Sequence, residues 1–349
     1  KMPATPLDDR RREVLRALIE LHVDTGDPVG SESLSRSLRR ALSPATLRSI
    51  MADLEALGYL GHPHTSAGRV PTDEGYRAYV DSLAGPRPLL PGEAERIRSE
   101  LRSPDASAEQ TLERASHLLS QLSRNVGFVL APDIARASFR HVDLVPLGHP
   151  RILVVMVSST GIVTHKVIEV EERLSPSDLS ACANYLNVHF AGMTLAEIRT
   201  RLLELMQQEK ALYDTLLQNV VALGERAFSV SESEASVYLD GASNILVRPE
   251  FDDVERMHAL FRTFEEKSRL VRILNACIAG DGIRVLIGHE NPDPGLRDMS
   301  LVTASCRVEG EPGFGVGVLG STRMEYAHVV SLVDHVARAV SQILQGNRA

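Results

Sequence analysis

The sequence contains no tryptophan, few other aromatic residues and few cysteines, and each scarcity excludes a class of protein. Aromatic residues make up 4% of the 349 residues, so aromatic cages and base-stacking platforms are not its main binding device. The three cysteines, Cys182, Cys277 and Cys306, lie far apart and form no CxxC pair. This spacing indicates neither a disulfide framework nor a zinc ribbon, and it suits a reducing cytosol.

Long apolar runs are also absent. The longest strongly apolar run covers residues 152–157, whereas a membrane-spanning helix needs about 20 apolar residues. The N-terminal segment carries charge and has no apolar stretch, which predicts no signal peptide. We therefore expect a cytoplasmic protein that does not associate with membranes.

The chain has no overall excess of positive charge, which argues against a protein that coats nucleic acid. Its formal net charge is −8 at pH 7. Positive charge is concentrated locally, because Arg36, Arg39, Arg40 and Arg48 lie between residues 33 and 52, where no acidic residue occurs. A sequence-specific DNA-binding protein needs local rather than overall positive charge, so this segment is a candidate DNA-facing element.

Apolar spacing in the first 85 residues predicts three helices followed by a β-hairpin. The second helix begins at a capping residue, Ser31, and the third begins at Ser43, with Pro44 at its first position. Gly58 ends the third helix, and two short strands flank the turn-forming loop over 62–68. This order of elements is typical of a winged helix-turn-helix.

The remainder of the chain predicts an α+β fold with a mostly antiparallel sheet. Helices between about 190 and 250 form an expected insertion, because strands of the sheet are predicted both before and after them. The predicted strands cover 152–158, 161–170, 237–239, 284–288, 301–308 and 314–319, and the predicted helices cover 93–125, 175–190, 194–228 and 252–278.

The third helix is the expected reader of base pairs. Its apolar stripe leaves small side chains and one cation facing outward, namely Ala45, Thr46, Arg48, Ser49 and Ala52. Arginine can pair with guanine through two hydrogen bonds, threonine and alanine methyls can contact thymine, and serine can reach a base or a phosphate. The alternative is a three-helix scaffold with a solvated basic face.

Residues around this helix are expected to contact the DNA backbone. Arg39 and Arg40, at the end of the preceding helix, suit phosphates. Arg69, in the hairpin, could enter a minor groove or bind its phosphates. The candidate DNA-binding set is Ser31, Arg39, Arg40, Ser43, Ala45, Thr46, Arg48, Ser49, Thr65, Ser66 and Arg69.

Four segments of the chain resemble the HrcA family of heat-inducible transcription repressors. They are TGDPVGS over 25–31, LSPATLRSIMADLEALGY over 42–59, HTSAGRVPTDEGYRAYVD over 64–81 and GVLGSTRMEY over 317–326. The resemblance runs nearly end to end, although residues 85–250 match in layout more than in sequence. One departure is Ser321, where the family usually has proline.

The resemblance implies a multidomain α+β protein with a winged helix, a GAF-like domain and a mainly helical dimerisation domain inserted into it. The expected division is a DNA-binding domain over 1–85, a linker over 86–104, the GAF-like domain over 105–190 and 251–349, and the inserted domain over 191–250. It also implies that a homodimer binds double-stranded DNA at the CIRCE inverted repeat upstream of chaperone genes. The chaperonin GroEL would assist the repressor into its active form, and heat would release repression.

Three motifs suggest other chemistry but lack the context that it requires. The glycines over 315–320 match a dinucleotide fingerprint, yet too little chain follows them for another parallel strand and its acid. His62 and His64 have no nearby cysteine or acid to complete a metal site. His289 and Glu290 have no nucleophile placed by spacing, so a polar turn is the simpler interpretation. We therefore predict no catalytic, metal or cofactor site.

Two alternatives of other classes remain open. The first is a ligand-sensing regulator, in which the central domain binds a metabolite and tunes the winged helix. The second is an enzyme with an accessory DNA-binding domain. A saturable thermal shift with a metabolite would favour the first, and turnover that depends on Glu290 would favour the second.

Overall fold

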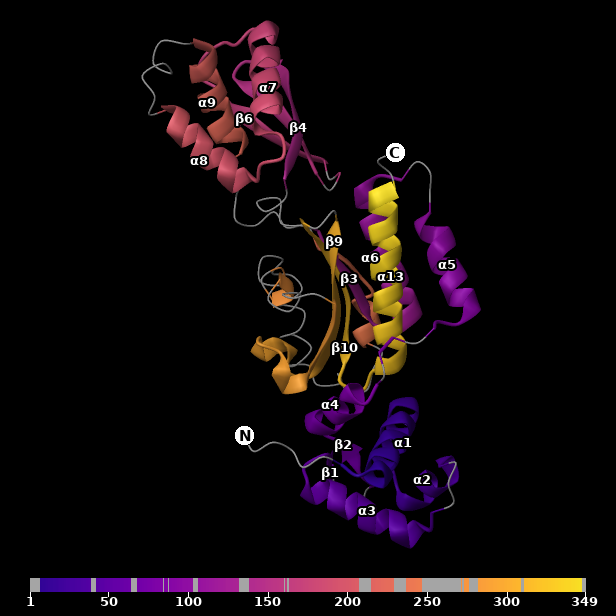
Figure 1. The fold of residues 1–349 in the computed structure, drawn as a ribbon. Helices are drawn as coiled ribbons and strands as arrows, with labels where there is room; N and C mark the ends of the chain where they lie inside the picture. The colour runs from indigo at the N-terminus through magenta and orange to yellow at the C-terminus, as the bar shows by residue number, and fades with distance from the viewer. Residues whose placement is uncertain are drawn as a thin grey trace.

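The chain folds into three structural units that are arranged in a row, with the unit that contains β3, β9 and β10 in the middle (Figure 1). We name them the N-terminal domain (residues 7–83), the core domain (88–131 and 237–346) and the inserted domain (138–228). The computed structural model describes residues 7–38, 42–63, 68–83, 85–86, 88–102, 106–131, 138–159, 161, 163–206, 215–228, 237–246, 271, 273–275, 282–308 and 311–346.

The N-terminal domain has the predicted order of elements. Its helices and strands are α1 (Asp9–Thr25), α2 (Ser31–Ser37), α3 (Pro44–Ala56), β1 (Leu60–Gly61), β2 (Val70–Pro71) and α4 (Asp73–Asp81). The side chain of Ser43 caps α3 by accepting a hydrogen bond from the Thr46 amide, as the sequence predicts. The cap of α2 differs from the prediction, because Gly30 is the N-cap and Ser31 is the first helical residue.

The hairpin of the N-terminal domain is joined by a third extended segment. Val29 and Arg69 exchange two backbone hydrogen bonds, with N–O distances of 2.8 and 2.9 Å. A Cβ atom on Gly68 would overlap the carbonyl group of Val29, so this close approach requires glycine. The bridge thus ties the base of the hairpin to the segment that precedes α2.

The core domain contains a five-stranded antiparallel sheet in the order β7-β3-β10-β9-β8. The strands are β3 (Val126–Leu130), β7 (Val237–Asp240), β8 (Gly282–Ile287), β9 (Met299–Val308) and β10 (Glu311–Ser321). Alternate residues of β9, Val302, Ala304 and Cys306, lie in the same hydrophobic cluster as helices α6 (Ala108–Ser123) and α13 (Tyr326–Gly346). Their neighbours Met299 and Leu301 pack on the opposite face of the sheet.

Two predictions about the core domain need correction. The helix predicted over 93–125 is two helices, α5 (Pro91–Leu101) and α6, and the linker predicted over 86–104 overlaps α5, whose Ile97 and Leu101 are completely buried in the core. Strand β3 was not predicted, since five consecutive buried residues show no alternation that a sequence reading can detect. The helix predicted over 252–278 lies mostly outside the described residues, and those described, 271 and 273–275, are helical.

The inserted domain is a separate α+β unit rather than a mainly helical one. It has a three-stranded antiparallel sheet of β4 (Phe139–Gly148), β5 (Arg151–Ser158) and β6 (Val163–Glu169). Helices α7 (Pro176–Phe190), α8 (Leu195–Met206) and α9 (Thr215–Ala227) share one hydrophobic cluster with one face of this sheet.

The insertion begins earlier in the chain than predicted. Residues 139–190, expected in the first part of the central domain, lie in the inserted domain together with α8 and α9. The predicted boundary between 190 and 191 therefore falls directly after α7, inside one hydrophobic cluster. The physical reason is that β4, which the sequence analysis missed, pairs with β5 and completes a sheet that does not join the core sheet.

The glycines over 315–320 belong to strand β10 and not to a loop that opens a helix. Gly317 lies against the ring of Phe128, and Gly320 lies against the side chain of Asn125. These glycines permit close packing of β10 on β3, so they do not form the loop that a dinucleotide fingerprint requires.

Candidate DNA-binding interface

Helix α3 presents a face of small side chains to solvent. Leu47, Ile50, Met51 and Leu54 are buried and anchor the helix on the rest of the domain. The opposite face consists of four exposed residues, Ala45, Arg48, Ser49 and Ala52. The structure therefore brings together the central part of the predicted set on one surface, and small side chains allow that surface to approach another molecule closely.

The N-terminus of α3 is held by its own cap. Thr46 is half-buried, and its hydroxyl oxygen lies 2.9 Å from that of Ser43. Ser43 is exposed and also accepts a hydrogen bond from the Thr46 amide over 3.1 Å. Both hydroxyls thus stabilise the start of the helix, whose positive dipole end favours a nearby anion such as a phosphate.

Arg48 is the cation that α3 leaves available for a ligand. It is exposed and makes no hydrogen bond or ion pair with any residue that the structure describes. The two acids of the helix are each paired with an arginine. Asp53 Oδ2 lies 2.6 Å from Arg11 Nη2, and Glu55 Oε2 lies 2.7 Å from Arg69 Nε. The exposed face of α3 therefore carries a net positive charge.

The Arg11–Asp53 pair also affects the protonation of the arginine. The hydrogen bond to Asp53, together with the charge of Asp8, raises the pKa of Arg11 above its ordinary value. Arg11 Nη1 lies 3.0 Å from Asp8 Oδ2, so one guanidinium contacts two carboxylates. This contact joins the start of α1 to the end of α3.

Arg69 is less available than the sequence analysis expects. Its guanidinium contacts Glu55 through Nε, and Nη1 lies 2.9 Å from His62 Nδ1. His62 Nε2 in turn lies 3.2 Å from Glu55 Oε1. The three side chains form a cluster between the end of α3 and the base of the hairpin, which we name the wing triad.

The wing triad contains two residues that sequence reasoning missed in this role. Glu55 had no assigned role, and His62 was considered only as a metal ligand. The pairing is tertiary, since 14 residues separate Glu55 from Arg69, and no local signal in the sequence could reveal it.

The remaining predicted residues are either half-buried or outside the described part of the chain. Ser31 is half-buried at the start of α2. Arg39 and Arg40, predicted to bind phosphates, and Thr65 and Ser66, predicted at the tip of the hairpin, lie outside the described residues.

The described part of the chain offers no alternative metal centre. Within it, no three histidine, cysteine, aspartate or glutamate side chains come close enough to hold a metal ion. His289 Nδ1 lies 2.7 Å from Asp73 Oδ2, so it contacts the N-terminal domain and not a group of acids. Nor is any helix in this part long and apolar enough to cross a membrane.

Two family models match the chain, one for each end. Residues 6–83 match the winged helix-turn-helix transcription repressor family described as HrcA DNA-binding. Residues 109–330 match the C-terminal domain of the HrcA protein.

Full-length relatives are similar over almost the whole chain. The heat-inducible transcription repressor HrcA of Geobacter sulfurreducens is 43% identical over 343 residues, which cover 98% of this chain and 99% of the relative. The corresponding protein of Moorella thermoacetica is 38% identical over 340 residues, covering 97% and 98%. A crystal structure of a hypothetical protein at 2.2 Å resolution has the same fold, with a TM-score of 0.62 at 22% identity, and the match covers 98% of this chain and 100% of that chain.

Proposed function

Because the chain belongs to the HrcA family of heat-inducible transcription repressors, we propose that it represses chaperone genes by binding the CIRCE inverted repeat as a homodimer. The family consists of transcription repressors and not of enzymes. The observation that carries the proposal is the exposed face of α3, which combines small side chains with one cation, Arg48, that has no acidic partner among the described residues.

Helix α3 is the proposed reader in the major groove. Arg48 would pair with a guanine, while Ala45 and Ala52 would contact thymine methyl groups. Ser43 and Ser49 would donate to phosphates or bases, and Thr46 would hold the helix start that faces the DNA backbone. Ser31, Arg39, Arg40, Thr65, Ser66 and Arg69 would contact the backbone around this helix.

The proposed dimer contact is the outer face of the inserted sheet. Val145, Val163 and Val167 on this face are 43%, 57% and 49% exposed, although each lies within a paired strand. The inner face of the same sheet packs on α7 to α9. Apolar side chains along one face of a sheet favour burial, and a second copy of the chain would supply the same complementary surface through a two-fold axis.

The central part of the chain has proposed roles that support repression. The core domain would be the GAF-like domain that joins the reader to the dimer contact. A two-fold dimer would present two copies of α3 to the two halves of an inverted repeat in the cytoplasm. GroEL would bind apolar surface exposed in the unfolded repressor, and a folded state of only about 5–15 kcal/mol would be lost on modest heating.

A binding titration at controlled salt concentration tests this proposal. Purified protein is titrated with a CIRCE duplex and with a scrambled duplex, with and without GroEL. Tight binding to CIRCE alone, improved by GroEL, would support the proposal. Equal weak binding to both duplexes would argue against it and would favour the ligand-sensing regulator, which a thermal-shift screen with metabolites would then address.

A further inference from the structure

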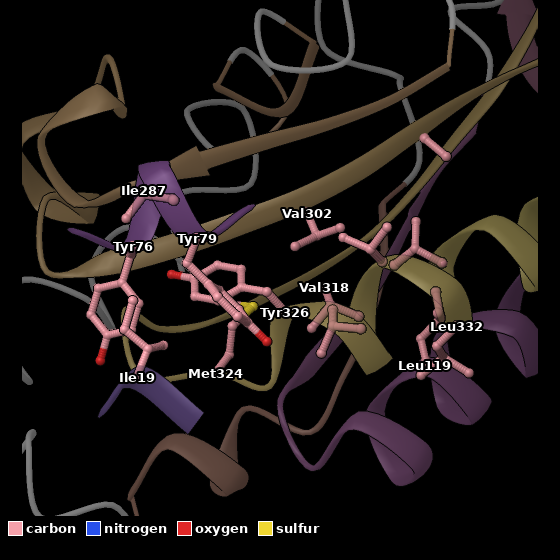
Figure 2. Close-up of a cluster of buried hydrophobic side chains, with 14 of the residues drawn as sticks. Ile19, Tyr76, Tyr79, Leu119, Ile287, Val302, Val318, Met324, Tyr326 and Leu332 are labelled. Carbon is pink, nitrogen blue, oxygen red and sulfur yellow. The ribbon is translucent and has the colours of Figure 1, made fainter. Parts of the chain in front are cut away.

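The N-terminal domain packs against the core domain through a shared cluster of buried apolar side chains, in addition to the covalent link between them. Tyr76 of α4 and Tyr326 of α13 are 3% and 0% exposed, and their ring centroids lie 5.7 Å apart. Figure 2 shows Tyr76 and Tyr79 beside Ile287, Met324 and Tyr326, so apolar side chains of both domains form one cluster. Packing of this kind resists separation of the two domains.

Polar contacts surround this apolar centre. Arg77 of α4 donates from Nε to Glu290 Oε1 over 2.8 Å and from Nη2 to the carbonyl oxygen of Val285 over 2.6 Å. A second Arg77–Glu290 hydrogen bond, between Nη2 and Oε2, makes the pair bidentate. Glu290 is itself held in place, since its Oε2 accepts from the Ile287 amide over 2.9 Å. Bidentate arginine–carboxylate pairs fix orientation as well as distance.

A second pair lies one helical turn away on α4. Asp73 Oδ2 accepts hydrogen bonds from the His289 amide over 3.0 Å and lies 2.7 Å from His289 Nδ1. Gly288 has a φ of +51°, and a Cβ atom there would overlap the carboxylate of Asp73. The glycine at position 288 therefore allows the Asp73 carboxylate to approach the backbone of the core domain closely.

A third contact involves a different helix of the N-terminal domain. Arg323 of the core domain donates from Nη1 to the carbonyl oxygen of Val23 over 3.1 Å, near the end of α1. Its guanidinium also lies against Gly26, which ends that helix. We name Asp73, Arg77, His289, Glu290 and Arg323 the interdomain clasp.

Contacts on two helices restrict both the tilt and the rotation of the N-terminal domain. A single contact would leave one rotation free, whereas α4 is held at two positions and α1 at a third. We infer that the interdomain clasp sets the half-site separation that the repressor accepts, by fixing the direction in which each α3 points. This inference rests on the proposed function, since only a dimer on an inverted repeat has a separation to select.

Because DNA is helical, a fixed orientation of the N-terminal domain would limit which half-site separations the protein can bind. Each additional base pair moves one half-site by about 3.4 Å and rotates it by about 34° relative to the other. A dimer with rigidly attached readers cannot follow that rotation without losing contacts. A dimer with loosely attached readers can follow it.

The test uses the full-length double variant His289→Ala/Glu290→Ala, in which the sequence of the DNA-binding domain is unchanged. A Glu204→Ala variant is the matched control, because Glu204 pairs with Arg201 at the surface of the inserted domain over 2.7 Å. Binding is measured to the CIRCE duplex, to duplexes with one base pair added or removed between the half-sites, and to a duplex with a single half-site.

The wild-type and control proteins should lose about tenfold or more in affinity when the separation changes. The double variant should lose less than about threefold, while its affinity for the single half-site stays within about twofold of wild type. A double variant that keeps the sharp preference, or that loses single half-site binding, would overturn the inference. Wild-type protein that binds no duplex specifically would instead overturn the proposed function, and this inference with it.

Discussion

Arg69 Nε lies 2.7 Å from Glu55 Oε2, so the arginine at the base of the hairpin is neutralised by an acid of α3. Replacement Glu55→Gln would remove this partner and free the guanidinium for DNA phosphates. We expect tighter binding to both the CIRCE and the scrambled duplex, because phosphate contacts carry no sequence information. The slope of log K against log salt concentration should steepen by about 0.9, which is the value for one additional phosphate contact.

Glu100→Gln is the control for that variant. It makes the same change in net charge on α5, where Glu100 Oε1 lies 2.5 Å from Arg96 Nε, and it should leave the salt slope unchanged. An unchanged slope for Glu55→Gln as well would mean that the released Arg69 does not reach the DNA.

Arg48 should contribute to sequence discrimination. The variant Arg48→Ala is expected to weaken CIRCE binding relative to scrambled DNA by ~1–3 kcal/mol, because it removes a base contact. Arg40→Ala should weaken binding to both duplexes about equally, as expected for a phosphate contact. Arg338→Ala is the control, since Arg338 lies exposed on α13 and pairs with Asp334 of the same helix. If Arg48→Ala and Arg40→Ala weakened binding to the CIRCE duplex and to the scrambled duplex by the same amounts, the assignment of Arg48 to a base and of Arg40 to a phosphate would be wrong.

The outer face of the inserted sheet should be sensitive to charge. Val167→Asp is expected to dissociate the proposed dimer, because a carboxylate buried in the contact would lack a partner. Sedimentation velocity at several protein concentrations measures the result. Leu90→Asp is the matched control, since Leu90 is 69% exposed at the start of α5 and outside the sheet. A Val167→Asp protein that sediments as wild type would place the dimer contact elsewhere.

Gly317 should be intolerant of a side chain. A Cβ atom there would lie 2.5 Å from the carbonyl oxygen of Val302 and would overlap the ring of Phe128. We expect Gly317→Ala to lower the free energy of unfolding by ~1–3 kcal/mol, measured by urea denaturation. Gly92→Ala should be neutral or slightly stabilising, because nothing lies within 4 Å of that position at the start of α5. Equal stability of the two variants would contradict the packing of β10 on β3.

The two described cysteines should be unreactive in the folded protein. Burial raises the pKa of Cys182 to about 11, with a further contribution from the charge of Asp178. Burial likewise raises the pKa of Cys306 to about 12. Because the thiolate is the reactive form, alkylation at about pH 8.5 should be slow until guanidinium unfolds the chain.

A Cys277→Ser background confines that measurement to Cys182 and Cys306, and mass spectrometry reports the modified residue. The same shifts predict that alkaline conditions reduce stability. The unfolded chain loses its thiol protons near an ordinary pKa of about 8.5, whereas the folded chain retains them, so the free energy of unfolding falls as the pH rises above that value. Rapid labelling of both thiols in folded protein would mean that helix α7, which holds Cys182, and strand β9, which holds Cys306, open readily.

The parts of the fold that the sequence predicts are those with local signals. Ser43, Pro44 and Gly58 mark both ends of α3, and the alternation of Val302, Ala304 and Cys306 marks β9. Strand β4 was missed because Arg140, His141 and Asp143 interrupt its apolar pattern, although its inner residues are buried against helices. That omission also shifted the predicted start of the insertion.

The same distinction applies to the candidate site. The outward residues of α3 follow from helical periodicity, so their shared face could be predicted. The interdomain clasp could not, since Arg77 and Glu290 lie 213 residues apart and neither carries a local signal of its partner. The sequence predicts a polar turn at His289 and Glu290, whereas the structure has a short 3-10 helix over Gly288–Glu290, and the contact of both residues with α4 depends on how the two domains dock.

The pairing of β3 with β7 has an architectural consequence. Leu130 and Val237 are directly opposite each other, so the chain leaves the core sheet and re-enters it at neighbouring positions. Opposed residues of antiparallel strands are only about 5 Å apart, a gap that a tight turn of about two to five residues can close. The inserted domain therefore lies between the ends of two neighbouring strands of the core sheet, β3 and β7. Its removal would convert β3 and β7 into an ordinary hairpin and would leave the N-terminal domain attached to an uninterrupted core sheet.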